Sequence, residues 1–246
     1  MKIVYTIILT IFALNVVQAD ELTTSQLLDK VDKQFRSDTS TSELEMQIET
    51  KNWKRTLKMR MWTKGMEKTL IQIDSPKKDR GISTLKRDKS MWNFFPKINK
   101  VIKIPASMMM GSWMGSDFTN DDLVKENTFV DDYTHKFFNK EDKEFYHIEI
   151  VPKEETVTVW GKITLKIRKS DNIIAQEVFY SENGEKIKIM EFTDVKIMGG
   201  KKIPSTMTLI PLKKKNQRTV IKYLKATFDG PVKDSIFTRK NLQKRR

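Results

Sequence analysis

The sequence has 246 residues, and its 46 Lys and Arg outnumber its 32 Asp and Glu, which gives a formal net charge of +14. It contains no Cys, which excludes disulfides, thiol catalysis and attachment of lipid to a cysteine. A charge this positive usually indicates polyanionic partners, among them nucleic acid and anionic lipid headgroups. Lysines that merely solvate the outer faces of strands would give the same balance.

The first residues have the pattern of a secretory signal peptide. Met1-Lys2 gives a positive start, Ile3 to Val17 is largely apolar, and Val17-Gln18-Ala19 places small residues at positions −3 and −1 of a cleavage site. The apolar run is shorter than the roughly 20 residues of a membrane-spanning helix. We therefore expect residues 1–19 to be removed and residues 20–246 to form one soluble domain in the periplasm, where nucleic acid is not a partner.

The exported part is predicted to begin with a helix. Thr23, Thr24 and Ser25 offer hydroxyl groups that cap a helix N-terminus. Apolar residues then follow at helical spacing, and they are Leu27, Leu28, Val31 and Phe35.

Beyond this helix the hydrophobic period changes to two. Apolar residues alternate with polar ones in about ten short runs, which include Leu44-Met46-Ile48, Leu57-Met59-Met61, Ile163-Leu165-Ile167 and Ile187-Ile189. Turn residues such as Ser75-Pro76 and Asn183-Gly184 separate the runs. So many antiparallel strands do not stay flat. The sequence therefore predicts an α+β fold that is mainly β, a strongly curved sheet or open barrel whose apolar side the helix covers.

One stretch, from Pro105 to Lys125, lacks this alternation and is rich in Met and aromatic residues. A long irregular insertion in a β protein is usually a functional lid or disordered, and this one is too apolar for disorder. We expect Ser116 or Asp117 to cap a short helix within it, and Asn120 or Asp121 to cap another.

Residues that could support catalysis or metal binding are sparse. The two histidines, His135 and His147, are isolated, and no Ser lies in a G-x-S-x-G motif. The acidic residues near Asp121 lack the spacing of a calcium loop, and helix-start carboxylates explain them. We expect no enzyme activity, metal or cofactor, although a convergent Ser-His-Asp site acting on lipids would leave no pattern in the sequence.

The Met and aromatic residues offer a different chemistry. Met108, Met109, Met110, Trp113, Met114 and Phe118 follow the aromatic strand that holds Trp92, Phe94 and Phe95. Such side chains suit a surface that repacks around variable apolar ligands. They would equally serve as ordinary core on the concave face of the sheet, and composition does not separate the two.

Several short blocks stand out along the chain, and they are Arg80-Gly81 followed by Leu85, Met91-Trp92, Phe95-Pro96, Ile104-Pro105, the M-G-S-D-F run from Met114 to Phe118, Ile203 to Met207, and Asp234 to Thr238. In this order they resemble the family of outer-membrane lipoprotein-sorting proteins, relatives of the periplasmic lipoprotein carriers and their outer-membrane receptors. The resemblance spans nearly the whole exported part. It departs from the family at Ile82, where a Thr is expected after Arg-Gly.

The resemblance implies an open antiparallel barrel of about eleven strands, closed by helices around an apolar cavity. It implies a monomeric carrier that binds acyl chains of a lipoprotein or a phospholipid, without cofactor or catalysis. Some family members look like partners of large exporters of the resistance-nodulation-division type, which makes such an exporter or a membrane surface a candidate partner.

From the alternation we expect six inward residues to line the cavity, namely Met46, Met59, Met61, Trp92, Phe94 and Ile104. The lid would be formed by the residues from Met108 to Phe118, and Arg80 and Lys103 would hold an anionic headgroup or dock on a membrane. The alternative is a periplasmic adaptor that binds a protein partner and whose filled core leaves no ligand-sized volume.

Overall fold

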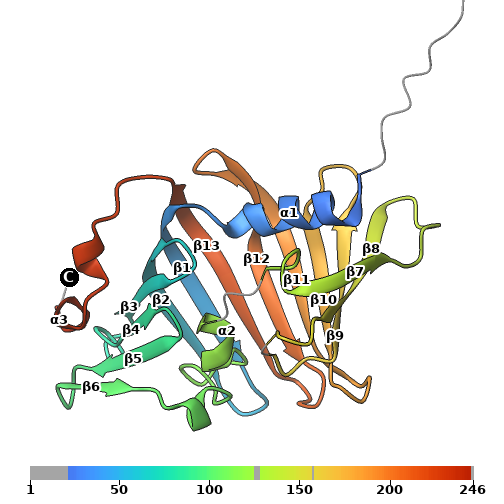
Figure 1. The fold of residues 1–246 in the computed structure, drawn as a ribbon. Coiled ribbons are helices and arrows are strands. Elements are labelled where there is room, and N and C mark those ends of the chain that lie inside the picture. The colour runs from blue at the N-terminus through green and yellow to red at the C-terminus, as the bar shows by residue number, and fades with distance from the viewer. Residues whose placement is uncertain (1–21, 125–127, 157, 245–246) are drawn as a thin grey trace, which may run out of the picture.

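The computed structural model describes residues 22–124, 128–156 and 158–244, and the predicted signal peptide lies outside them. In these residues thirteen strands form one antiparallel sheet that does not close (Figure 1). The prediction of a mainly β fold built on an open, curved sheet is confirmed. The strand number is higher than the eleven or so that the family resemblance implies.

The sheet is built from two meanders that meet in its middle. The first meander contains β1 (Thr39–Glu49), β2 (Lys54–Lys64), β3 (Lys68–Ser75), β4 (Ser83–Arg87), β5 (Ser90–Phe95) and β6 (Lys100–Lys103). The second contains β7 (Tyr133–Phe137), β8 (Phe145–Pro152), β9 (Lys162–Arg168), β10 (Ile174–Tyr180), β11 (Lys186–Met198), β12 (Lys201–Pro211) and β13 (Arg218–Phe228). Because β13 pairs with β1, the strands β6 and β7 are left as the two edges of the sheet.

The predicted N-terminal helix is confirmed as α1 (Thr24–Phe35), and Thr23 caps it through a reciprocal pair of hydrogen bonds with Gln26. Leu27, Leu28 and Val31 are buried in a core with apolar residues of β7 to β12. Figure 1 shows α1 lying across that half of the sheet. The helix thus covers the concave face of the second meander.

The chain between β6 and β7 covers the concave face of the first meander. We call residues 105–124 the cover segment; it contains a 3₁₀ turn, η1 (Ala106–Met108), and the short helix α2 (Asn120–Val124). Its Trp113 is 3% exposed and packs in one cluster with Met46, Met59 and Met91. The cover segment is therefore held in place by its packing against side chains of the sheet.

A second core, which the sequence did not predict, lies on the opposite face of β2 to β5. The C-terminal segment with η2 (Asp234–Ile236) and α3 (Arg239–Leu242) buries Phe237 and Leu242 there. Leu70, Leu85 and Phe94 are the sheet residues that they cover. The strands near this edge are thus apolar on both faces.

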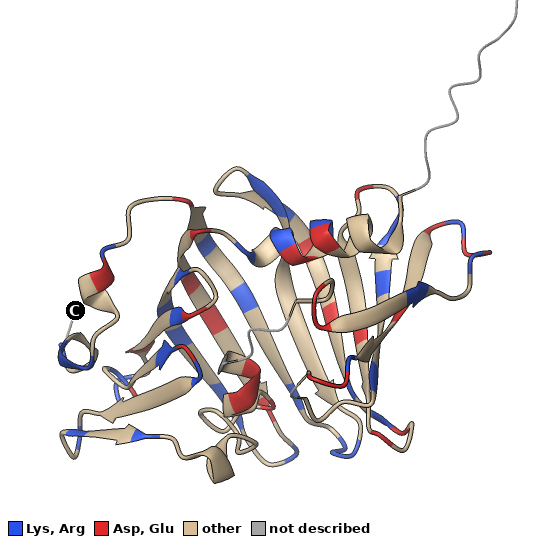
Figure 2. Cartoon of the chain, in the orientation of Figure 1, with Lys and Arg blue, Asp and Glu red and all other residues tan. Residues whose placement is uncertain are grey.

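Lys and Arg are distributed over many strands and turns rather than gathered on one element (Figure 2). This distribution fits lysines that solvate the outside of a sheet. Within the described residues, none of the helices has the length and hydrophobicity of one that crosses a membrane.

Candidate ligand-binding site

A cavity of about 370 Å³ lies where the two concave cores meet, between the cover segment and the sheet, and Arg36 at the end of α1 is among its lining residues. Small-molecule sites usually have roughly 300–1,000 Å³. The apolar residues that line it are Leu44, Met59, Met61, Ile71, Trp113, Phe118, Leu123, Phe129, Tyr133, Ile163, Phe179, Met190, Met207, Ile221 and Tyr223. Four charged residues also reach it, and they are Arg36, Asp122, Glu177 and Lys188.

One anchor of the cover segment is Asp117, whose side chain is 1% exposed. Its carboxylate accepts hydrogen bonds from Thr219 Oγ1 at 2.8 Å and from Gln217 Nε2 at 2.5 Å, while its backbone N–H donates to Thr219 Oγ1. Met114 and Gly115, which precede it, both have positive φ and turn the chain toward β13. The Asp of the M-G-S-D-F run is thus a tether to β13 and does not cap a helix.

The second anchor comes from α2. Thr119 and Asp122 cap this helix reciprocally, because each side chain accepts a hydrogen bond from the other's backbone N–H. The same Asp122 carboxylate accepts hydrogen bonds from Lys188 Nζ of β11, at 2.9 Å and 3.1 Å. The predicted caps at Asn120 and Asp121 are wrong, since the cap is one residue earlier. The ion pair fastens α2 to the far wall of the cavity.

The Lys188 ammonium is deeply enclosed. Its side chain is 7% exposed, and Nζ lies 4.7 Å from the centroids of the Trp160 and Phe179 rings. Ring faces and one carboxylate together replace the water that this cation loses on burial. Nearby, burial raises the pKa of Tyr223 to about 12 and keeps its phenol neutral. The cavity is therefore mainly apolar, and its charged groups are the Asp122–Lys188 pair beneath α2 together with Arg36 and Glu177.

The structure places the residues predicted for the site in several locations. Four of them line the cavity, namely Met59, Met61, Trp113 and Phe118. Met46, Ile104 and Met114 belong to the surrounding core cluster without lining the cavity. Met109 is half-buried beside η1.

Other predicted positions lie away from the cavity. Trp92 and Phe94 are on the opposite face of the sheet, packed with the C-terminal segment, because Met91 and Asn93 take the concave positions of β5. Met108 and Met110 are 56% and 49% exposed, respectively. Arg80 is bonded to the Asp74 carbonyl at the β3–β4 turn, and the Lys103 ammonium lies 5.7 Å from the centroid of the Trp92 ring on the edge strand β6. Neither cation reaches the cavity.

Sequence reasoning missed Lys188 and Asp122 as a pair. The sequence pattern put Ile187 and Ile189 on the apolar face of their strand, whereas Lys188 and Met190 are the buried residues in the structure. A signal existed, since Met190 and Phe192 share the phase of Lys188 and both pack in the core beneath α1. Hydrophobicity alone did not select that phase, because the alternative phase is equally apolar.

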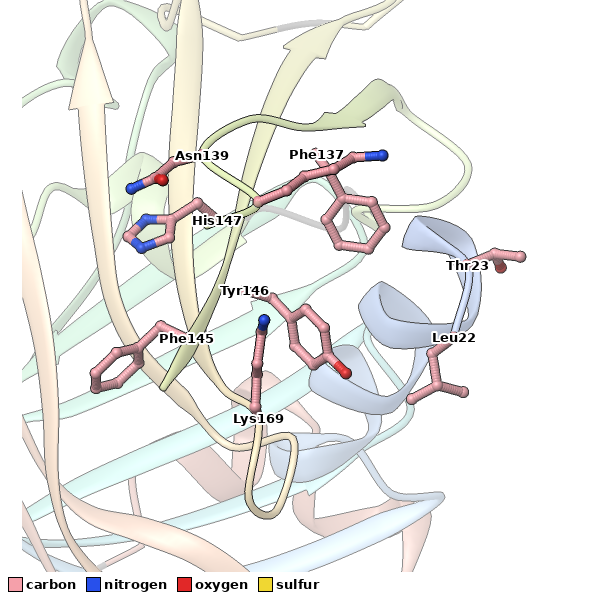
Figure 3. A pocket seen from close by; sticks show the side chains of 9 residues that line it. Leu22, Thr23, Phe137, Asn139, Phe145, Tyr146, His147 and Lys169 are labelled. Carbon is pink, nitrogen blue, oxygen red and sulfur yellow. The ribbon is translucent and has the colours of Figure 1, made fainter. Parts of the chain in front are cut away.

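A second, smaller cavity of about 220 Å³ lies at the start of α1 (Figure 3). Tyr146 and Phe137 form part of its wall, together with His147 of β8. His147 Nε2 is 2.8 Å from Asp142, and the other histidine, His135, is bonded to Thr24 Oγ1 at the same distance. Both histidines thus have structural partners. Among the described residues there is also no cluster of three or more potential metal ligands.

Comparisons with known proteins agree with this architecture. A crystal structure of a DUF1329 family protein from Desulfovibrio piger is 22% identical, with a TM-score of 0.78 over 89% of this chain and 97% of that one. A domain described as an outer membrane lipoprotein-sorting protein, from Vibrio parahaemolyticus, is 18% identical, with a TM-score of 0.74 over 89% and 98%. A LolA superfamily protein from Nitrosomonas europaea is 20% identical, with a TM-score of 0.73 over 89% and 99%.

At these identities the likeness is one of fold. No protein with a curated description matches the sequence. A family model described as "-like: Uncharacterized protein" matches residues 65–244, which is more than half of the chain. The chain therefore belongs to that family, and the solved structures confirm the fold that the LolA-like, lipoprotein-sorting resemblance implies.

Proposed function

We propose that this protein is a periplasmic carrier that binds acyl chains of a lipoprotein or a lipid and moves them between the envelope membranes. The observation that carries the proposal is the apolar cavity of about 370 Å³ beneath a non-strand cover. The LolA-like fold and the export signal predicted for residues 1–19 support it. The exporter partner that the resemblance implies stays a prediction.

The energetics of transfer require such a cavity. Exposing a methylene to water costs about 0.8 kcal/mol, so a chain of roughly 15 methylenes costs on the order of 12 kcal/mol. A few hydrogen bonds do not supply this, and the chain must be almost completely buried. Because the cavity is at the low end of the usual size range, a second chain requires the cover segment to move outward.

A membrane-facing end is part of the proposal. The β1–β2 and β12–β13 turns lie next to each other, since Arg218 at the start of β13 pairs with Glu49 at the end of β1. Trp53, 43% exposed, and Leu212, 41% exposed, are on these turns. Five lysines accompany them, and they are Lys51, Lys54, Lys213, Lys214 and Lys215. Cations beside exposed apolar side chains suit a surface of anionic lipids.

The proposal is tested by native mass spectrometry of protein purified gently from periplasm, followed by organic extraction. We expect a stoichiometric acyl-bearing molecule. A protein adaptor, in contrast, would give a clean apo mass that does not change after incubation with phospholipid vesicles and lipopeptides, and this result would overturn the carrier proposal.

Variants connect the bound molecule to the cavity. Trp113→Asp places a charge in the lining and is expected to abolish the bound mass, whereas Met110→Asp, on the exposed side of the cover segment, should leave it unchanged. Far-ultraviolet circular dichroism verifies folding, and Leu123→Asp replaces Trp113→Asp if the latter unfolds. Equal lipid content in the folded cavity variant and the control would show that the cargo binds elsewhere.

A further inference from the structure

The cavity wall contains a buried cation that is paired with an anion of the cover segment. Lys188 Nζ donates to both carboxylate oxygens of Asp122, which lies in the five-residue helix α2. The amine also lies against the rings of Phe179, on β10, and of Trp160, just before β9. The cation is therefore fixed by the sheet, whereas its anion is supplied by the cover.

A buried ammonium must keep an anion close to it, because an uncompensated charge in an apolar site is very costly. Any ligand that displaces α2 separates Asp122 from Lys188 and must replace the carboxylate. A ligand with a neutral head cannot do so, whereas a carboxylate or phosphate can. The wall next to this spot is apolar, with Met190, Phe179 and Ile163 among its residues, and it suits a hydrocarbon tail.

From these contacts we infer that Lys188 is the anion-binding residue of the cavity and that the ligand is a single-chain anionic amphiphile. Its carboxylate or phosphate takes the place of Asp122 at Lys188 Nζ, and this exchange releases α2 from the cavity wall. The inference rests on the proposed carrier function and specifies its ligand class. The size of the cavity, about 370 Å³, supports one chain rather than two.

The test compares ligands that share a 16-carbon chain and differ in the polar head group. Binding of palmitate, hexadecyl phosphate and neutral monopalmitoylglycerol to the mature protein is measured by displacement of a fluorescent fatty acid. We expect the wild type to prefer an anionic head over the neutral one by about tenfold, the effect of one charge-assisted hydrogen bond. The ratio between palmitate and hexadecyl phosphate identifies whether the natural head is a carboxylate or a phosphate.

Two variants assign the preference to the ion pair. Lys188→Met combined with Asp122→Asn removes both charges with little change in volume, and it should bind all three ligands equally. Asp122→Asn alone removes the competing carboxylate, and it should bind palmitate about tenfold more tightly than the wild type. Lys33→Met is the control, because Lys33 is an exposed lysine of α1 paired with Asp29, and its ligand preference should be that of the wild type.

The possible results separate the role of Lys188 from the carrier function. A preference that survives in the folded double variant, or equal binding of all three ligands by the wild type, overturns the role of Lys188 and leaves the carrier function standing. Failure of all three ligands to bind a wild type that does take up a lipopeptide or a phospholipid overturns the single-chain ligand class, and failure of all of these molecules to bind overturns the carrier function itself. If the double variant does not fold, an unchanged palmitate affinity in Asp122→Asn overturns the inference, and the expected increase supports it.

Discussion

Replacing Asp117 by Ala tests whether the cover segment is tethered to β13 as the structure shows. The carboxylate is buried and accepts two hydrogen bonds, from Thr219 Oγ1 and Gln217 Nε2. A hydrogen bond to a charged group contributes about 1.5–3 kcal/mol, and an abandoned buried donor adds to the loss. Thr219 is 0% exposed, so no water replaces its acceptor without rearrangement. We expect the free energy of unfolding to fall by about 3–5 kcal/mol.

The assay is equilibrium unfolding in guanidinium chloride, followed by tryptophan fluorescence and by circular dichroism. Asp121→Ala is the matched control, since this neighbouring acid is in the first turn of α2 and should contribute about 0.3–1 kcal/mol through the helix dipole. If both variants lose the same small amount, Asp117 acts as a helix-start carboxylate and the tether to β13 has no energetic importance.

Two further predictions concern the C-terminal core and acid stability. Phe237→Ala should lower the free energy of unfolding by about 3–5 kcal/mol, because the side chain is buried. The control Phe138→Ala removes a side chain that is 38% exposed and should lower it by under about 1 kcal/mol. Equal losses of unfolding free energy in the two variants would contradict a second core. The hydrogen bond with His147 lowers the pKa of Asp142 to about 2. Its carboxylate therefore stabilises the fold above the ordinary pKa of 3.8, and this contribution is lost as the pH falls through about 2. Asp142→Asn should be less stable than the wild type at pH 6 and equally stable near pH 2, and a difference that does not change with pH would refute this.

Much of the fold could be predicted from local patterns. In β1 the residues Leu44, Met46 and Ile48 alternate with polar ones and are all buried on the concave face. The period of α1 is equally clear, because Leu27, Leu28 and Val31 are the residues that it buries. In both elements one face is apolar and the other polar, so the sequence contains enough information to orient them.

The sequence did not predict which face of a strand is buried where both of its faces are apolar. In β11 the alternating apolar residues read from the sequence are Ile187 and Ile189, and a shift by one residue moves every side chain to the other face. The buried position of Lys188 depends on Asp122, which is 66 residues away in sequence. In β5 the error with Trp92 has the same origin, since its partner Phe237 is supplied by the C-terminal segment. Contacts with residues distant in sequence therefore determine which face of β11 and of β5 is buried.

In the open sheet, the cover segment could move and release a ligand without breaking the pairing between strands. The pairing of β1 with β13 makes the hydrogen-bond ladder continuous from β6 to β7. The chain between these edge strands includes the cover segment, which is fastened to the sheet by side chains such as Trp113, Asp117 and Asp122. Moving it outward breaks those contacts and leaves the strand ladder intact. Of the two charged fasteners, Asp122 lines the cavity and Asp117 does not. A ligand bound as we propose would therefore compete directly with the Asp122 contact, while the tether at Asp117 would keep the cover segment attached to β13.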